Sequence, residues 1–165
     1  WNPAVKTKKD QEALLQGLLD NHLDVLATDH APHTKEEKKN VYTKAPSGGP
    51  LVQHALPALL QMHHQGKISL EKIVEKACHN PAILFQIEKR GFIREGYKAD
   101  LVLVDLNSPW AVQPDNIYSK CQWSPFEGTT FKSRITHTFV NGNLVYKNFK
   151  HQPFTKVAER LTFDR

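Results

Sequence analysis

The stretch that decides the fold is ATDHAPHT, residues 27–34, which places a carboxylate and two imidazoles directly after a short apolar run. The preceding residues 24–28 (DVLAT) are too few and too β-branched for a helix, so they predict a buried strand. Asp29 would then lie at or just past the carboxyl end of that strand. In parallel barrels this end carries the active site. A single Asp-His pair, however, is more often a polar turn with solvated histidines.

The octet as a whole resembles the signature of the dihydroorotases, which belong to the amidohydrolase superfamily. Hydantoinases and allantoinases of that superfamily carry a similar Asp-His pair, but usually not the Ala-Pro-His that follows it. Other segments of the chain also resemble dihydroorotases. They are Asn2-Pro3 before a charged helix at 7–21, Asn80-Pro81-Ala82, residues 91–105 (GFIREGYKADLVLVD), residues 123–128 (WSPFEG) and residues 138–142 (TFVNG).

This resemblance implies an α/β fold: the C-terminal part of a TIM (β/α)8 barrel amidohydrolase, followed by strands of the small β-sandwich domain. Such a barrel needs about 250 residues, and the chain has 165. The superfamily also requires a His-x-His pair, a bridging lysine or acid and two further histidines, and none of these can be placed here. We therefore expect the missing N-terminal part of the same enzyme to complete the site, and the chain alone to be inactive and poorly folded.

The hydrophobic period changes near residue 90, which predicts the last barrel strand and its helices in residues 1–88 and a β domain in residues 89–165. Thr7 and Asp10 form a capping box for a first helix, with a core stripe of Leu14, Leu15, Leu18 and Leu19. Further helices are predicted at 52–60, with Pro57 early, at 69–77, capped by Ser69, and at 80–85. Strands are predicted at 101–104, 135–140 and 144–146, the last two joined by an Asn141-Gly142 type I′ turn.

Residues 35–50 mix charged residues with proline and glycine, a composition that disfavours regular structure and predicts a mobile loop. A loop of this length within a compact domain is usually functional or disordered.

Composition limits the classes of function. No apolar run approaches the roughly 18 residues of a membrane span, so neither a transmembrane segment nor a signal peptide is expected. The two cysteines have no metal-type spacing, so free thiols in the cytoplasm are expected. The net charge of +5 comes from scattered lysines without interleaved aromatic residues, which indicates a solvated surface and no nucleic-acid partner.

The chemistry of the resemblance requires Zn2+, binuclear in the family, because bound zinc lowers the pKa of water to about 7. Asp29 would be a metal ligand and the catalytic residue. It would act as the general base in ring opening and as the acid that protonates the leaving nitrogen. In the biosynthetic direction the same residue serves the closure of N-carbamoyl-L-aspartate to L-dihydroorotate.

The resemblance also implies a set of substrate-binding residues. His33 would bind the substrate carboxylate, Asn2 would contact the ring, and Ser47 and Gly48 would offer backbone groups. The family usually has Phe-Gly where this chain has Ser47-Gly48. The remaining histidines are expected to be structural: His30 to orient the strand end, and His54, His63, His64 and His79 to be surface or capping residues.

Three functions remain open at this point. The first is an active zinc dihydroorotase of de novo pyrimidine synthesis, of which this chain would be the last third. It would act on a small-molecule substrate and form a homo-oligomer. The second is a non-catalytic homologue that scaffolds aspartate transcarbamoylase. The third is another cyclic amidase, a hydantoinase or allantoinase, against which Ala31-Pro32-His33 argues.

Overall fold

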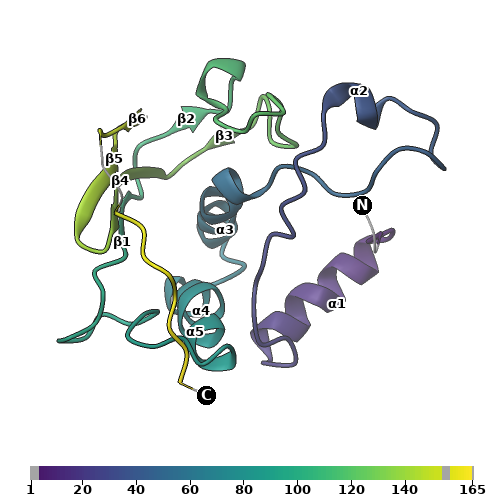
Figure 1. Ribbon diagram of the computed structural model, residues 1–165. Helices are drawn as coiled ribbons and strands as arrows, with labels where there is room; N and C mark the ends of the chain where they lie inside the picture. Colours follow the sequence, from purple (N-terminus) through teal and green to yellow (C-terminus); the bar gives the residue numbers. More distant parts are fainter. Residues whose placement is uncertain (1–3, 154–156, 165) are drawn as a thin grey trace.

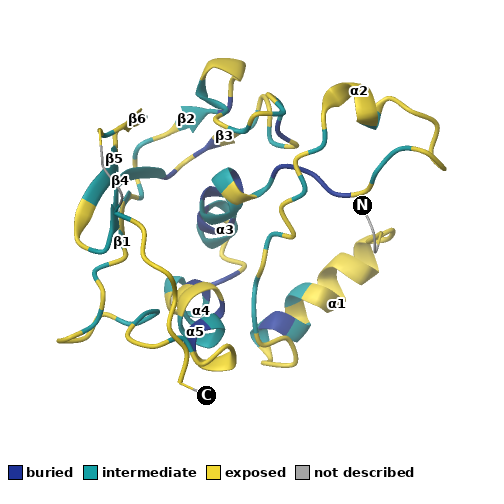
Figure 2. Ribbon diagram, viewed as in Figure 1, coloured by how far each residue is buried: buried dark blue, intermediate teal, exposed yellow. Residues whose placement is uncertain are grey.

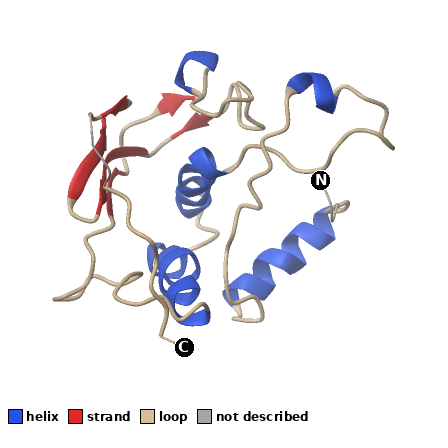
Figure 3. Ribbon diagram, viewed as in Figure 1, coloured by secondary structure: helices blue, strands red, loops and turns tan. Residues whose placement is uncertain are grey.

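The computed structural model describes residues 4–153 and 157–164, with most of the helices in the first half of the chain and the strands in the second (Figures 1 and 3). The helical elements are α1 (Lys8–Leu19), α2 (Lys35–Lys38), the 3-10 turn η1 (Val52–His54), α3 (Ala55–His64), α4 (Leu70–Val74), the π-helical turn η2 (Glu75–His79), α5 (Asn80–Leu84) and the 3-10 turn η3 (Pro114–Asn116). The strands are β1 (Leu101–Asp105), β2 (Trp110–Ala111), β3 (Thr130–Phe131), β4 (Arg134–Val140), β5 (Asn143–Lys147) and β6 (Lys150–His151).

Helix α1 begins as predicted. Thr7 accepts a hydrogen bond from the Asp10 backbone N–H at 3.1 Å, and the Asp10 carboxylate accepts one from the Thr7 N–H at 2.9 Å, which completes the capping box. The predicted core stripe is partly wrong, however. Leu18 is buried, but Leu14 is 47% exposed. The described residues cover a face of α1 that is narrower than its stripe of leucines.

The helices from α3 to α5 also follow the sequence prediction. Pro57 lies in the first turn of α3, where its missing N–H costs no helical hydrogen bond. Ser69 caps α4 by accepting from the Lys72 N–H at 3.1 Å. The π-helical turn η2 joins α4 to α5 and was not predicted; it directs Lys76 into the interior.

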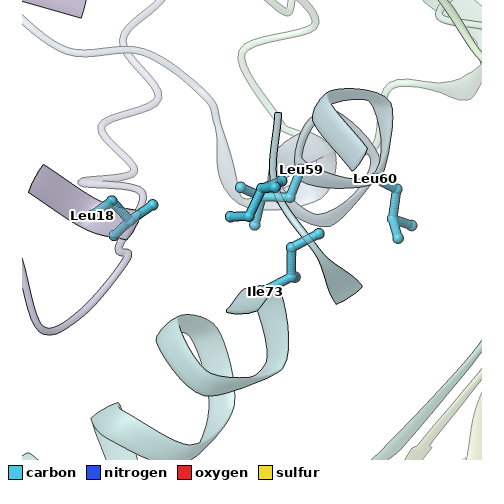
Figure 4. Close-up of a cluster of buried hydrophobic side chains, with 5 residues drawn as sticks. Leu18, Leu59, Leu60 and Ile73 are labelled. Carbon is cyan, nitrogen blue, oxygen red and sulfur yellow. The ribbon is translucent and has the colours of Figure 1, made fainter. Parts of the chain in front are cut away.

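The main core lies where α1, α3 and α4 meet. Figure 4 shows Leu18, Leu59 and Ile73 directed toward the space between these helices. Leu60 and Ile68 complete the buried cluster, and Val104 from β1 packs against it. This contact joins the helical half to the sheet, so that the two halves share apolar contacts.

The predicted strand at residues 24–28 is wrong: this segment is extended but unpaired. A strand needs a neighbour whose backbone completes its ladder, and among the described residues no strand lies beside it. The backbone of this segment forms hydrogen bonds with the helices instead. The Leu26 N–H donates to the Lys76 carbonyl at 3.0 Å, and the Asn80 side chain donates to the Asp24 carbonyl at 2.7 Å.

The main sheet is antiparallel, with strand order β1-β4-β5-β6, and β2 pairs with β3 in a separate ribbon. The predicted hairpin turn is confirmed, since Asn141 and Gly142 have φ values of 48° and 80°, as a type I′ turn requires. Within the described residues β1 is unpaired on its outer edge, and its Val102 and Leu103 are 45% and 50% exposed. Exposed residues also make up most of α1 (Figure 2). None of the helices in the described ranges has both the length and the apolarity for crossing a bilayer.

Gly91 is expected to be indispensable to the packing of α5. Its φ is +79°, and an added Cβ would lie 2.4 Å from the Ala82 Cβ and 2.7 Å from the Cys78 carbonyl oxygen. Gly91→Ala should therefore lower the free energy of unfolding by about 1–2 kcal/mol for the left-handed backbone and by about 1–3 kcal/mol more for overpacking.

Gly96→Ala is the matched control, because Gly96 has a φ of +78° and no atom within 4 Å of the added Cβ. Thermal and urea denaturation of the two variants measure the difference. Equal losses of stability would show that the collision at Gly91 relaxes without cost.

Candidate active site

The octet at residues 27–34 follows the extended segment that runs between α1 and α4 and up toward α2 (Figure 1). At its centre Asp29 has a φ of +44°, a left-handed conformation that aspartate tolerates better than most residues. Asp29 is exposed, and no hydrogen-bond partner of its carboxylate is found among the described residues. The structure therefore presents this carboxylate to an incoming ligand.

His30 fixes the direction of the chain immediately after Asp29. Its Nδ1 accepts hydrogen bonds from the backbone N–H groups of Leu51 and Val52, at 3.1 and 3.2 Å. An Nδ1 that accepts carries no proton, so in the neutral ring the proton lies on Nε2. This contact ties the octet to the start of η1 and agrees with the orienting role predicted for His30.

The C-terminal end of the 35–50 segment packs directly on the octet. His30 and Gly49 form a parallel bridge, and the Ala31 N–H donates to the Gly49 carbonyl at 3.1 Å. Gly48 has a φ of +89°, and a Cβ there would lie 2.5 Å from the Ala31 Cβ. Glycine is therefore required at position 48 by both its conformation and its close approach to Ala31.

The prediction that residues 35–50 lack regular structure is wrong at one end, because residues 35–38 form α2. The cap is reciprocal: Thr34 accepts from the Glu37 N–H at 3.2 Å, and Glu37 accepts from the Thr34 N–H at 2.7 Å. The hydrogen bond from the Thr34 backbone is the main reason that the pKa of Glu37 is lowered, followed by the bond from the Thr34 hydroxyl. This helix was not predicted from the composition because it is only one turn long.

His33 lies between this cap and the C-terminal half of the chain. Its Nδ1 is 3.7 Å from Glu37 Oε2, and its backbone carbonyl accepts the Trp123 indole N–H at 2.7 Å. The ring is half-buried and remains accessible to a ligand. Trp123, from the C-terminal half of the chain, is thereby in direct contact with the octet.

His54 is buried, so the prediction that it is a surface or capping residue is wrong. It is 1% exposed, its Nδ1 lies 3.0 Å from the Ser124 hydroxyl, and its ring is near Trp110, Phe126 and Phe131. Burial lowers its pKa, since the charged ring would lose its hydration. A signal was present in the sequence, because His54 lies three residues before the buried Pro57, at helical spacing.

The structure brings together some of the predicted site residues. Asp29, His33 and Gly48 lie on two segments bridged by backbone contacts, with Ser47 exposed next to Gly48. Asn2 lies outside the described residues. In the part of the chain that the structure describes, no group of three or more His, Cys, Asp or Glu side chains could hold a metal ion. Asp29 therefore fits zinc as one ligand, not as a complete site.

The octet thus presents a carboxylate and an imidazole on one loop. The sequence profile of the Amidohydrolase family matches residues 4–145, and the chain belongs to this family.

Relatives within the family are named more specifically. A protein named dihydroorotase from Halobacterium salinarum is 45% identical over 127 residues, which cover 77% of this chain and 30% of that protein. A dihydroorotase from Anoxybacillus flavithermus is 42% identical over 148 residues, covering 88% and 34% respectively. The chain thus spans about a third of the length of the curated relatives it matches. The predicted resemblance to dihydroorotases is confirmed.

Solved structures agree on the fold. L-hydantoinase (dihydropyrimidinase) from Arthrobacter aurescens superposes with a TM-score of 0.90 at 29% identity, over 98% of this chain and 37% of that one. Dihydropyrimidinase from Brevibacillus agri NCHU1002 gives a TM-score of 0.85 at 27% identity, over 92% and 34%. The fold is therefore that of part of a TIM-barrel amidohydrolase, as the sequence predicted.

Trp123 is expected to stabilise the octet through its indole N–H. Trp123→Phe keeps the aromatic ring but leaves the His33 carbonyl without this donor, at a cost of about 1 kcal/mol. Hydrogen exchange at the Ala31 and His33 amides, both hydrogen-bonded in the structure, should then accelerate roughly five-fold.

Trp110→Phe serves as the control, because the Trp110 indole donates to the Ser133 carbonyl, away from the octet. The role assigned to Trp123 is wrong if its variant leaves exchange at Ala31 and His33 unchanged, or if both variants accelerate it equally.

His54 should make stability depend on pH. Because the pKa of His54 is lowered in the folded protein, the unfolded state takes up its proton first, below a pH of about 6.5. Stability is then full above that pH and falls as pH decreases, by up to about 1.4 kcal/mol per pH unit. His54→Gln should flatten this fall in urea unfolding between about pH 7 and 5.5, whereas replacement of the exposed His22 by Gln should not. If the stability of His54→Gln falls with pH as steeply as that of the wild type, His54 is not the cause of the pH dependence.

Proposed function

We propose that the chain contributes the Asp29 loop of a dihydroorotase, which cyclises N-carbamoyl-L-aspartate reversibly to L-dihydroorotate in de novo pyrimidine biosynthesis. The observation that carries this proposal is the octet itself: an exposed Asp29 and an accessible His33 on a loop tied down on both sides. The names of the curated relatives support it.

Asp29 is the proton-transferring group in this proposal. In ring opening its carboxylate takes the proton of the attacking water and then delivers it to the leaving amide nitrogen, and ring closure reverses both transfers. Zinc, when bound, supplies a hydroxide near neutral pH. The left-handed backbone at Asp29 and the His30 contact that follows it determine where the chain presents this carboxylate.

His33 and the Ser47-Gly48 backbone bind the substrate. The imidazole can donate to the carboxylate that dihydroorotate carries, and the Glu37 carboxylate lies 3.7 Å from its Nδ1. Gly48 lets the loop backbone lie close to the octet. Asn2 would contact the ring of the substrate.

The other metal ligands have to come from outside the described residues, either from the same polypeptide or from another one. Two surfaces suit such a partner. One is the unpaired outer edge of β1, with Val102 and Leu103 exposed. The other is an apolar cavity of about 420 Å3 between α3 and the sheet, whose lining includes Trp110 and Phe149.

In this arrangement residues 1–88 belong to the barrel and residues 89–165 to the β domain. We propose that the assembled enzyme is cytoplasmic and homo-oligomeric, and that aspartate transcarbamoylase is a candidate partner. A non-catalytic scaffold of that transcarbamoylase is the alternative if the other ligands are missing.

A second enzymatic candidate is a hydantoinase-type cyclic amidase, favoured by the structural similarity to the Arthrobacter and Brevibacillus enzymes. The two candidates differ in the substrate carboxylate, for which His33 provides a partner. Dihydroorotate and dihydrouracil, which lacks this carboxylate, therefore distinguish them.

Asp29→Asn should abolish hydrolysis of L-dihydroorotate by the complete zinc-loaded polypeptide that carries this chain. The amide keeps the size of the side chain but cannot take up the proton, and loss of such a group costs roughly 100-fold to 10,000-fold in kcat. The measurement is steady-state hydrolysis, with dihydrouracil as the second substrate.

Asp115→Asn is the control, since Asp115 is exposed in η3 and is distant from the octet in the sequence. A folded, zinc-loaded parent that turns over dihydrouracil alone would favour the second candidate. One that turns over neither substrate would favour the non-catalytic scaffold.

A further inference from the structure

The side chain of Lys38 closes the long loop that follows the octet. From the last position of α2, its Nζ lies 2.7 Å from the Pro46 carbonyl oxygen and 2.9 Å from the Gly48 carbonyl oxygen. One ammonium group thus holds the carbonyls on both sides of Ser47. The residues between, 39–45, are mostly exposed, and Tyr42 is 94% exposed, so little else packs on this part of the loop.

These two contacts determine which way the loop peptides face. In a trans peptide the C=O and N–H groups point in opposite directions. With the Pro46 carbonyl on the ammonium group, the Ser47 N–H points away from Lys38. Among the described residues no acceptor is found for the N–H groups of Ser47 and Gly48. Ser47 is exposed, so its N–H is available to a ligand.

The base from which Lys38 reaches is itself fixed to the octet. Lys38 ends the single turn that Thr34 and Glu37 cap, and Thr34 is the last residue of the octet. On the other side of the loop, Gly49 is bridged to His30. The Lys38 contact therefore completes a ring of interactions that runs from the octet through α2 and back to the octet.

We propose that Lys38 is a positioning residue for substrate binding: its ammonium group holds the Pro46 and Gly48 carbonyls, so that the Ser47 N–H faces a carbonyl or carboxylate oxygen of the substrate. The contact also strengthens this donor, because a cation on the carbonyl polarises the whole peptide group. This inference rests on the proposed function, and it assigns to Lys38 no contact with the substrate.

The test uses the complete polypeptide and three variants. Lys38→Met removes the ammonium group and keeps the length, Lys38→Arg restores a cation with donors, and Lys39→Met is the control. Lys39 is the neighbouring residue; it is exposed, and no side-chain contact of it is found among the described residues. Steady-state hydrolysis of L-dihydroorotate gives KM and kcat. Hydrogen exchange at the Ala31 amide, which donates to the Gly49 carbonyl at 3.1 Å, reports the anchoring of the loop without reference to activity.

In Lys38→Met we expect KM to rise roughly ten-fold, kcat to change by less than about three-fold, and exchange at the Ala31 amide to accelerate. Lys38→Arg should recover most of the KM, and Lys39→Met should match the wild type. A wild-type KM in Lys38→Met, or an equal rise in Lys39→Met, overturns the role of Lys38 while leaving the dihydroorotase proposal intact. A loss confined to kcat also overturns it. A folded parent without activity on dihydroorotate overturns both.

Discussion

The buried ammonium group of Lys76 is the interaction on which the placement of the octet depends. Lys76 is 1% exposed, and its Nζ donates to the Leu23 carbonyl at 2.8 Å while the Glu75 carboxylate lies 3.5 Å away. Its backbone carbonyl accepts from Leu26, so one residue holds both ends of the turn into the extended segment. A buried cation is costly unless it is paired. This cost restricts the segment to the path that supplies the Leu23 carbonyl.

From that constraint the rest of the site follows in sequence. The π-helical turn η2 directs Lys76 inward, the extended segment leads to Asp29, and His30 then attaches the chain to the start of η1. Because the segment has no strand neighbour among the described residues, backbone and side-chain groups of the helices replace the missing ladder.

Local signals in the sequence predicted much of this fold. Capping by Thr7 and Ser69 and the Asn141-Gly142 turn depend on residues close together in the chain, and all three are confirmed. The features that were missed depend on distant partners. The burial of His54 needs Ser124, the Trp123 contact needs His33, and the π-helical turn has no compositional signature. The octet was recognised because its chemistry is contiguous, but the groups that orient it are spread across the chain.

The Trp123 contact has a consequence for the order of folding. Its two residues are 90 positions apart, so the loop that must close before the indole reaches the His33 carbonyl comprises more than half of the chain. Closing such a loop is entropically expensive, and contacts of this range form late. On the ribosome the octet emerges well before its tryptophan. It therefore remains without one of its anchors until the WSPFEG segment has been synthesised, and any nascent chain that stops earlier lacks a fully ordered Asp29 loop.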